Sequence, residues 1–152
     1  MRIRTLLSLT ALMASGLSFA GTVNTPVPVN ANVANSCVFN TAAPVINIPT
    51  YKATDASPAA GQTSVDVLCN TGTQPFVTYW QNEPNLALAL VASNSDVLNV
   101  TLGYGTDPTA PTAGAGGGDV WTYVLTATPT AGQFGASTGT TYTNTQDYIV
   151  AF

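Results

Sequence analysis

Val23-Asn24-Thr25-Pro26-Val27-Pro28-Val29-Asn30-Ala31-Asn32-Val33 is the stretch that decides the fold. Along it, apolar or β-branched residues alternate with asparagine and proline. Successive side chains of an extended chain point to opposite sides, so one face carries an almost continuous apolar row. A strand with one apolar face needs a hydrophobic groove. The residues predicted to face that groove are Val23, Thr25, Val27, Val29, Ala31 and Val33.

Two prolines in this segment restrict how it can pair. Proline has no N–H, and backbone N–H groups alternate in direction along a strand. Pro26 and Pro28 therefore remove donors from the same edge and leave the opposite edge able to pair. We expect the segment to pair fully along one edge only. It could fold back onto its own domain or enter another molecule, and its residues favour neither.

The rest of the chain is typical of an antiparallel β-sandwich. Its apolar segments are short, rich in Val, Thr, Ile and aromatic residues, and separated by glycine and proline. Besides 23–33, the predicted strands are 38–48, 63–69, 76–80, 97–104, 120–126 and 142–152. The run 86–92 (LALALVA) fits either a helix or a buried strand, and 112–118 (TAGAGGG) is interpreted as a mobile loop. Seven short strands at this spacing predict the sandwich.

The C-terminal strand has no partner after it in the chain. Tyr148, Val150 and Phe152 share one face, and the chain stops on that aromatic residue. A sandwich that ends on a core strand leaves an unpaired position beside that strand. The N-terminal segment of the same chain or of another molecule could fill it. The last strand could also be a tolerated edge.

Composition excludes several classes of function. Charged residues make up 7% of the chain, there is no histidine, and the net charge is −4. Without histidine, neither histidine-dependent catalysis nor a histidine metal site is possible. The three basic residues, Arg2, Arg4 and Lys52, are too few to neutralise a run of phosphates. The sequence therefore predicts a non-enzymatic protein with no cofactor, no metal and no nucleic-acid partner.

The first twenty residues predict export. Met1–Arg4 is a short positive region, 5–17 is apolar but too short to span a bilayer, and Ser18-Phe19-Ala20 fits a signal-peptidase site. We expect cleavage after Ala20. Two cysteines, Cys37 and Cys69, remain in the exported chain, so an oxidising compartment favours a disulfide between them. Closing that loop would contribute roughly 3.7 kcal/mol on the chain-entropy model.

Two sets of side chains suggest ligand sites, each with a plainer alternative. Asp107 and Asp119 flank the glycine-rich segment and could bind calcium, although solvated loop acids fit the sparse spacing better. An aromatic set could stack on a carbohydrate, although alternation within strands favours core packing. The members of that set are Tyr79, Trp80, Trp121 and Tyr123. They support an alternative function, a self-complemented secreted adhesin or carbohydrate-binding sandwich.

Several short motifs occur in a distinctive order. They are Asn35-Ser36-Cys37 after the alternating arm, Val67-Leu68-Cys69-Asn70, Pro129-Thr130-Ala131-Gly132-Gln133, and Tyr142-Thr143-Asn144-Thr145 before the final Val150-Ala151-Phe152. In this order they resemble the spore coat protein U domain family, which includes the pilin subunits of archaic chaperone–usher pili. The similarity covers essentially all of the chain after the signal peptide. Gln146 and Asp147 depart from it, because the family usually alternates Val with Thr there.

The resemblance implies an incomplete immunoglobulin-like sandwich that lacks its last strand. Residues 21–34 would be a donor-strand arm, and 35–152 would be the pilin domain with the Cys37–Cys69 disulfide. A periplasmic chaperone would fill the groove first, and the arm of the next subunit would replace it at an outer-membrane usher. The product would be a surface pilus that serves adhesion and biofilm formation. The implied acceptor groove comprises Val45, Ile46, Ile48, Tyr148, Val150 and Phe152.

Overall fold

The computed structural model describes residues 26–152. The predicted signal peptide, Val23 and Thr25 lie outside the described residues. Residues 33–152 form one compact unit, and 26–32 are the described part of the unit before it. The strands are β1 (Cys37–Phe39), β2 (Gly61–Cys69), β3 (Val77–Trp80), β4 (Ala87–Ala92), β5 (Val97–Tyr104), β6 (Thr112–Ala113), β7 (Asp119–Pro129), β8 (Tyr142–Thr143) and β9 (Tyr148–Ala151), with one short 3-10 helix, η1 (Ala115–Gly117).

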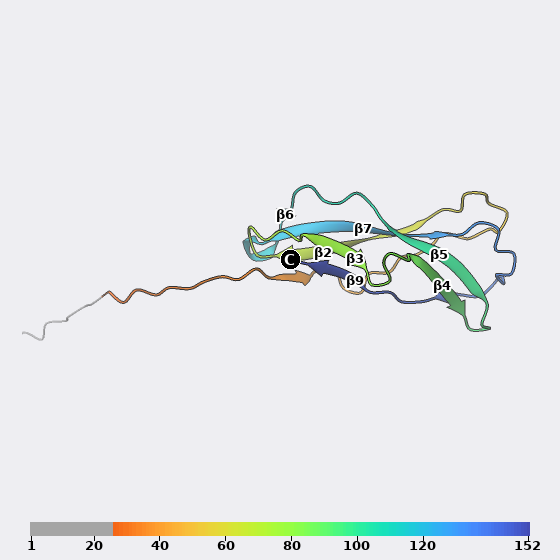
Figure 1. The fold of residues 1–152 in the computed structure, drawn as a ribbon, viewed down its shortest axis with the longest axis horizontal. Helices are drawn as coiled ribbons and strands as arrows, with labels where there is room; N and C mark the ends of the chain where they lie inside the picture. Colours follow the sequence, from red (N-terminus) through yellow and green to blue (C-terminus); the bar gives the residue numbers. More distant parts are fainter. Residues whose placement is uncertain (1–25) are drawn as a thin grey trace, which may run out of the picture. The chain divides into compact units, whose positions relative to one another are not determined.

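The strands form two antiparallel sheets (Figure 1). The large sheet has the order β1-β2-β7-β5-β4-β8, with β6 also paired to β7. The small sheet contains β3 and β9. Every strand pair is antiparallel. The prediction of an all-β antiparallel sandwich is therefore confirmed. Within residues 26–152, no helix is long and apolar enough to cross a membrane.

The core lies between the small sheet and the inner face of the large one. Every second residue is buried on β2 from Val65 onward and on β7 from Trp121 onward, and the register places Val65 opposite Tyr123 and Val67 opposite Trp121. Burying each such side chain contributes about 1.5–3 kcal/mol. The buried hydrophobic residues are Val65, Val67, Cys69, Trp80, Ala92, Leu98, Val100, Leu102, Trp121, Tyr123, Leu125 and Ala127.

Aromatic side chains join the small sheet to the large one. The Tyr148 ring of β9 lies 5.5 Å from Trp80 and 6.1 Å from Tyr123, measured between ring centroids. The backbone N–H of Trp80 donates to the Tyr104 hydroxyl on β5 at 2.9 Å. Burial raises the pKa of Tyr148 to about 12. This cluster holds β9 against the large sheet.

Four predicted segments differ from the observed elements. Residues 26–33 contain no strand, so the predicted strand 23–33 is wrong for its described part, with which no other segment of residues 26–152 pairs. Only β1 and an isolated bridge from Asn47 to Gln62 form in the predicted strand 38–48, which Pro44 interrupts. The segment 142–152 is split into β8 and β9. The glycine-rich segment 112–118 forms β6 and η1 beside β7 rather than an unpaired loop.

The segment 86–92, left open between helix and strand, forms β4. Leu88 and Leu90 pack against the core, while the intervening Ala87 and Ala89 are exposed. Leucine and alanine are good helix formers, but their alternation has the period of a strand. Pairing with β5 and burial of one face therefore outweigh helix propensity here.

The turn after β7 is fastened by one glutamine. The Gln133 side-chain amide donates to the carbonyl oxygens of Asn99 and Thr130, at 2.9 and 2.8 Å, and its Oε1 accepts from the Asn99 N–H at 2.6 Å. Tyr51 donates its hydroxyl to the Thr130 carbonyl and accepts from the Gln133 N–H. Gly132 has φ 76°, in the left-handed region that favours glycine. The turn is thereby tied to β5.

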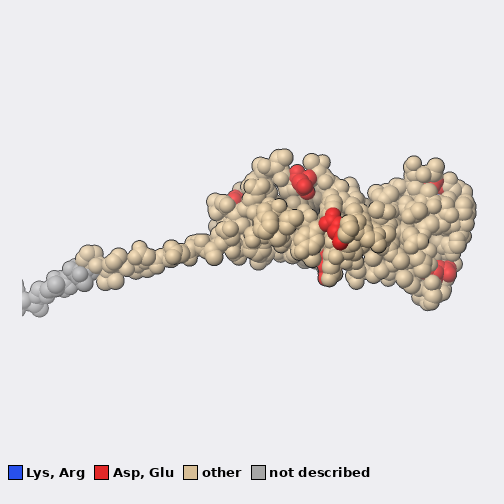
Figure 2. Space-filling view, in the orientation of Figure 1, with Lys and Arg blue, Asp and Glu red and all other residues tan. Residues whose placement is uncertain are grey.

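The surface carries few charges. Figure 2 shows scattered acidic groups on an otherwise uncharged face. Lys52 is the one basic residue among residues 26–152. Threonine, serine, asparagine and glycine therefore supply most of the polarity, and ion pairs contribute little to the fold.

Candidate strand-acceptor groove

Two strand edges lie unpaired beside each other. Among the described residues, β1 ends the large sheet and pairs only with β2, while β9 pairs only with β3 in the small sheet. Figure 1 shows the C-terminus close to β1, with the two strands pointing in opposite directions. Unpaired strand edges present free N–H and C=O groups that can accept another strand. Within residues 26–152, the edges of β1 and β9 that face each other are both free to pair with a further strand.

An apolar hollow of about 40 Å³ lies between these edges. Val67 of β2, only 2% exposed, belongs to its lining. Its other lining residues are Cys37, Val38, Phe39, Val150 and Phe152. Val38, Phe39 and Phe152 are 58%, 52% and 45% exposed, unusually high values for large apolar residues. The hollow therefore offers apolar surface for another element to bury.

The β1 side of the groove is held in place by covalent and polar contacts. Cys37 and Cys69 form a disulfide, as predicted. Asn70 accepts from the Ser36 N–H at 2.8 Å and donates its side-chain amide to the Ala34 carbonyl at 3.2 Å. Farther along, the Asp66 N–H donates to the Thr41 hydroxyl at 2.6 Å. A three-residue edge strand is thus anchored along its length.

The structure brings only some of the predicted acceptor residues together. Val150 and Phe152 line the hollow, and Tyr148 belongs to the neighbouring aromatic cluster. Ile46 and Ile48 pack against the core around Val65, away from the hollow's lining. Val45 is 63% exposed and does not line it either. The acceptor role of the six residues stays a prediction.

Three lining residues were missed as groove residues by the sequence reasoning. Val67 alternates correctly for a buried face and is buried, so its local pattern does not mark it as part of the lining of a hollow. Val38 and Phe39 follow Cys37 directly, and two adjacent apolar residues cannot both be placed inward by alternation. Their place in the lining of the hollow follows only from the position of β1 at the edge of the large sheet.

The described arm residues are exposed. Val27, Val29 and Val33 have exposed fractions of 74%, 91% and 81%, and Ala31 is also exposed. Pro26–Asn32 forms no helix, strand or turn. The predicted donor face therefore keeps most of its apolar surface available for burial.

The lining of the hollow between β1 and β9 is apolar and carries no ionisable side chain. Across residues 26–152, no three histidine, cysteine, aspartate or glutamate side chains gather into a possible metal site. Asp119 instead accepts from the Gly72 N–H at 2.9 Å. Comparisons with family models, with curated proteins and with solved structures found no match to this chain.

Proposed function

We propose that this chain is a structural subunit of an extracellular fibre, in which the N-terminal arm of one copy fills the groove between β1 and β9 of the next. The observation that carries the proposal is the pair of unpaired edges with exposed apolar residues between them. An added strand would satisfy both edges with backbone hydrogen bonds and cover the hollow with its side chains. The polymer would be a pilus at the cell surface, serving adhesion and biofilm formation.

The arm has the features that such a strand requires. One face carries valines at every second or fourth position, and Val27 and Val29 keep most of their surface exposed. Burying four valine side chains contributes on the order of 6–12 kcal/mol before the cost of ordering the arm. Pro26 and Pro28 weaken only one edge, and they favour an extended conformation before insertion.

The chain just before β1 favours a donor from another molecule. Asn70 holds Ala34 and Ser36 by hydrogen bonds, so this segment continues the path of β1. To enter its own groove, the arm would have to reverse sharply at or before Val33. The arm of a second copy needs no such reversal. Each copy then gives one arm and receives one, so the contact is head-to-tail. Such contacts build an open filament rather than a closed ring.

The opposed directions of β1 and β9 suggest the orientation of the donor. An inserted strand must run parallel to one of them and antiparallel to the other (Figure 1). If it runs antiparallel to β9, the donating domain lies at the end of the groove away from Cys37. The acceptor's own arm joins its domain at the Cys37 end. Subunits would therefore follow one another in line.

The groove also accounts for the other proposed partners. Before assembly, an exposed apolar hollow with two free edges is an aggregation hazard. A periplasmic chaperone would prevent aggregation by filling the groove temporarily. At an outer-membrane usher, the arm of the next subunit would then replace the chaperone. The chain would reach the periplasm through the signal peptide at residues 1–20, cleaved after Ala20.

Deleting Gly21–Asn32 tests the proposal against a self-complemented monomer. We expect the parent chain to give a heat-resistant ladder of multimers on a denaturing gel, and the deletion to abolish it. An arm of the same composition but shuffled order, which breaks the alternation, is the matched control and should also fail to polymerise. A parent chain that stays monomeric, and whose deletion variant only loses thermal stability, would overturn the fibre proposal.

A further inference from the structure

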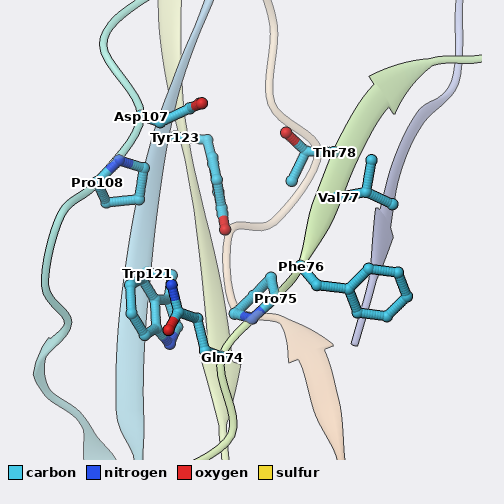
Figure 3. A pocket seen from close by; sticks show the side chains of 9 residues that line it. All are labelled: Gln74, Pro75, Phe76, Val77, Thr78, Asp107, Pro108, Trp121 and Tyr123. Atoms are coloured by element: carbon cyan, nitrogen blue, oxygen red, sulfur yellow. The ribbon is translucent and has the colours of Figure 1, made fainter.

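A second and larger hollow lies at the other edge of the small sheet. Its volume is about 340 Å³, within the range of small-molecule sites. It is bounded by β3 and the segment before it, by the inner face of β7, and by the segment that follows β5 (Figure 3). The groove described above borders β9, so the two hollows lie on opposite edges of the same two-stranded sheet.

Fixed aromatic rings form one side of this cavity. Trp121 and Tyr123 on β7 are each 6% exposed, and the indole N–H of Trp121 donates to the Thr73 carbonyl at 3.2 Å. Figure 3 shows the Tyr123 ring edge-on between Pro108 and Thr78. Each ring presents only a small part of its surface to the cavity, and a ring held this way loses no side-chain freedom when a ligand contacts it.

Uncommitted polar groups lie around the rings. The Gln74 amide, the Asp107 carboxylate and the Tyr123 hydroxyl make no hydrogen bond to another residue within 26–152. The Asp107 carboxylate is turned toward Thr78 across the cavity (Figure 3). Carboxylate, amide and hydroxyl together can both donate to and accept from a ligand that is itself rich in hydroxyl groups.

The loop that carries Asp107 is fastened at both ends. The Gly105 N–H donates to the Val124 carbonyl at 2.7 Å, and β6 pairs with the start of β7. Asp107 therefore lies in a loop, residues 106–111, whose two ends are both tied to β7. Preorganisation of this kind lowers the entropic cost of binding.

Charge narrows the class of ligand. The cavity lining contains one acidic side chain and no basic one. A phosphate, sulfate or carboxylate group would meet Asp107 without any compensating cation. We propose that this cavity binds a neutral sugar, which contacts the exposed edges of Trp121 and Tyr123 and whose hydroxyl groups bond to Asp107 and Gln74.

The site is compatible with the proposed fibre but does not rest on it. A strand added to β9 would occupy the opposite edge and leave the cavity open. In a fibre, the cavity would recur in every subunit, and weak sites would combine into strong attachment through multivalency. A single chain would still bind one sugar per cavity.

To test this, the chain is titrated with the methyl glycosides of glucose, galactose, mannose and N-acetylglucosamine. The protein keeps its N-terminal arm and is used in whichever assembly state it adopts. Calorimetry and tryptophan fluorescence should show saturable binding of at least one of them, with Kd on the order of millimolar. Choline chloride serves as the cationic comparator. A cation would bind through the Asp107 carboxylate and the aromatic rings, and it would not need the Gln74 amide.

Asp107→Asn, Gln74→Ala and Tyr123→Phe should each weaken sugar binding at least five-fold without changing the melting temperature by more than a few degrees. Asp55→Asn, which removes an exposed acid outside the cavity, should leave binding unchanged. The proposal is overturned if no glycoside binds saturably or if the cavity variants bind as well as the parent. It is also overturned if choline binds more tightly than every sugar. Fibre formation in the same samples is scored separately.

Discussion

The Gln133 side chain ties the turn after β7 to β5. Replacing it measures how much these hydrogen bonds stabilise the fold. Gln133→Ala removes three side-chain hydrogen bonds, two to Asn99 and one to Thr130. Each intramolecular hydrogen bond contributes about 0.5–1.5 kcal/mol, and these are partly exposed. We therefore expect the free energy of unfolding to fall by about 2–3 kcal/mol. For a domain of this size the melting temperature should drop by roughly 8–12 °C.

Thermal unfolding followed by circular dichroism measures this effect, and Gln62→Ala is the matched control. Gln62 is an exposed glutamine on β2 whose side chain makes no hydrogen bond within residues 26–152, so its loss should cost less than about 0.5 kcal/mol. Gln133→Glu should be nearly as damaging as alanine, because it loses both amide donors and places a negative charge beside two carbonyl oxygens. Equal melting temperatures for Gln133→Ala and Gln62→Ala would refute the claim that the hydrogen bonds of the Gln133 side chain stabilise the fold.

Three further outcomes are expected. Replacing Cys37 and Cys69 together by alanine should lower the free energy of unfolding in denaturant by about 3–4 kcal/mol, and an unchanged value would contradict the anchoring of β1. Tyr148 has its pKa raised by burial from 10.0 to about 12, so its neutral form stabilises the fold below pH 10 and that stability is lost as the pH rises toward 12. Tyr148→Phe should flatten the fall in melting temperature over this window, although Tyr104 and Tyr123, with raised pKa values of their own, retain part of it. Val29→Asp should abolish multimers, whereas Asn30→Asp, on the opposite face, should leave most of them; equal effects would show that the arm has no groove-facing side.

Several strand positions were predictable from the sequence, because apolar and polar residues alternate within a single short segment. Residues 97–104 correspond to β5 without change, and Val65 and Val67 are buried as their spacing requires. The Cys37–Cys69 bond was also predictable, since only two cysteines are present. Each of these features depends on a local pattern or a simple count.

The groove was less predictable because it depends on which elements are missing. Nothing in the order Cys37-Val38-Phe39 says that β1 stops after three residues, or that Phe39 remains half exposed beside β9. Ile46 and Ile48 have the same apolar character as Val150, but tertiary packing turns them toward the core around Val65. Local patterns predict which residues avoid water, and only the assembled sheets decide which of them are left uncovered.

The central claim is that the arm of one copy enters the groove of another, and a cysteine trap tests it directly. One chain carries Val29→Cys in the arm, a second and differently tagged chain carries Phe39→Cys in β1, and the two are assembled together and oxidised. Phe39 lies opposite Val67 and so shares the buried face of β2 toward which the arm valines would point. We predict disulfide-linked dimers containing both tags, with the bond between positions 29 and 39. The contradictory result would be no mixed dimer, with a bond forming only when both cysteines are placed in the same chain and that chain remains a monomer.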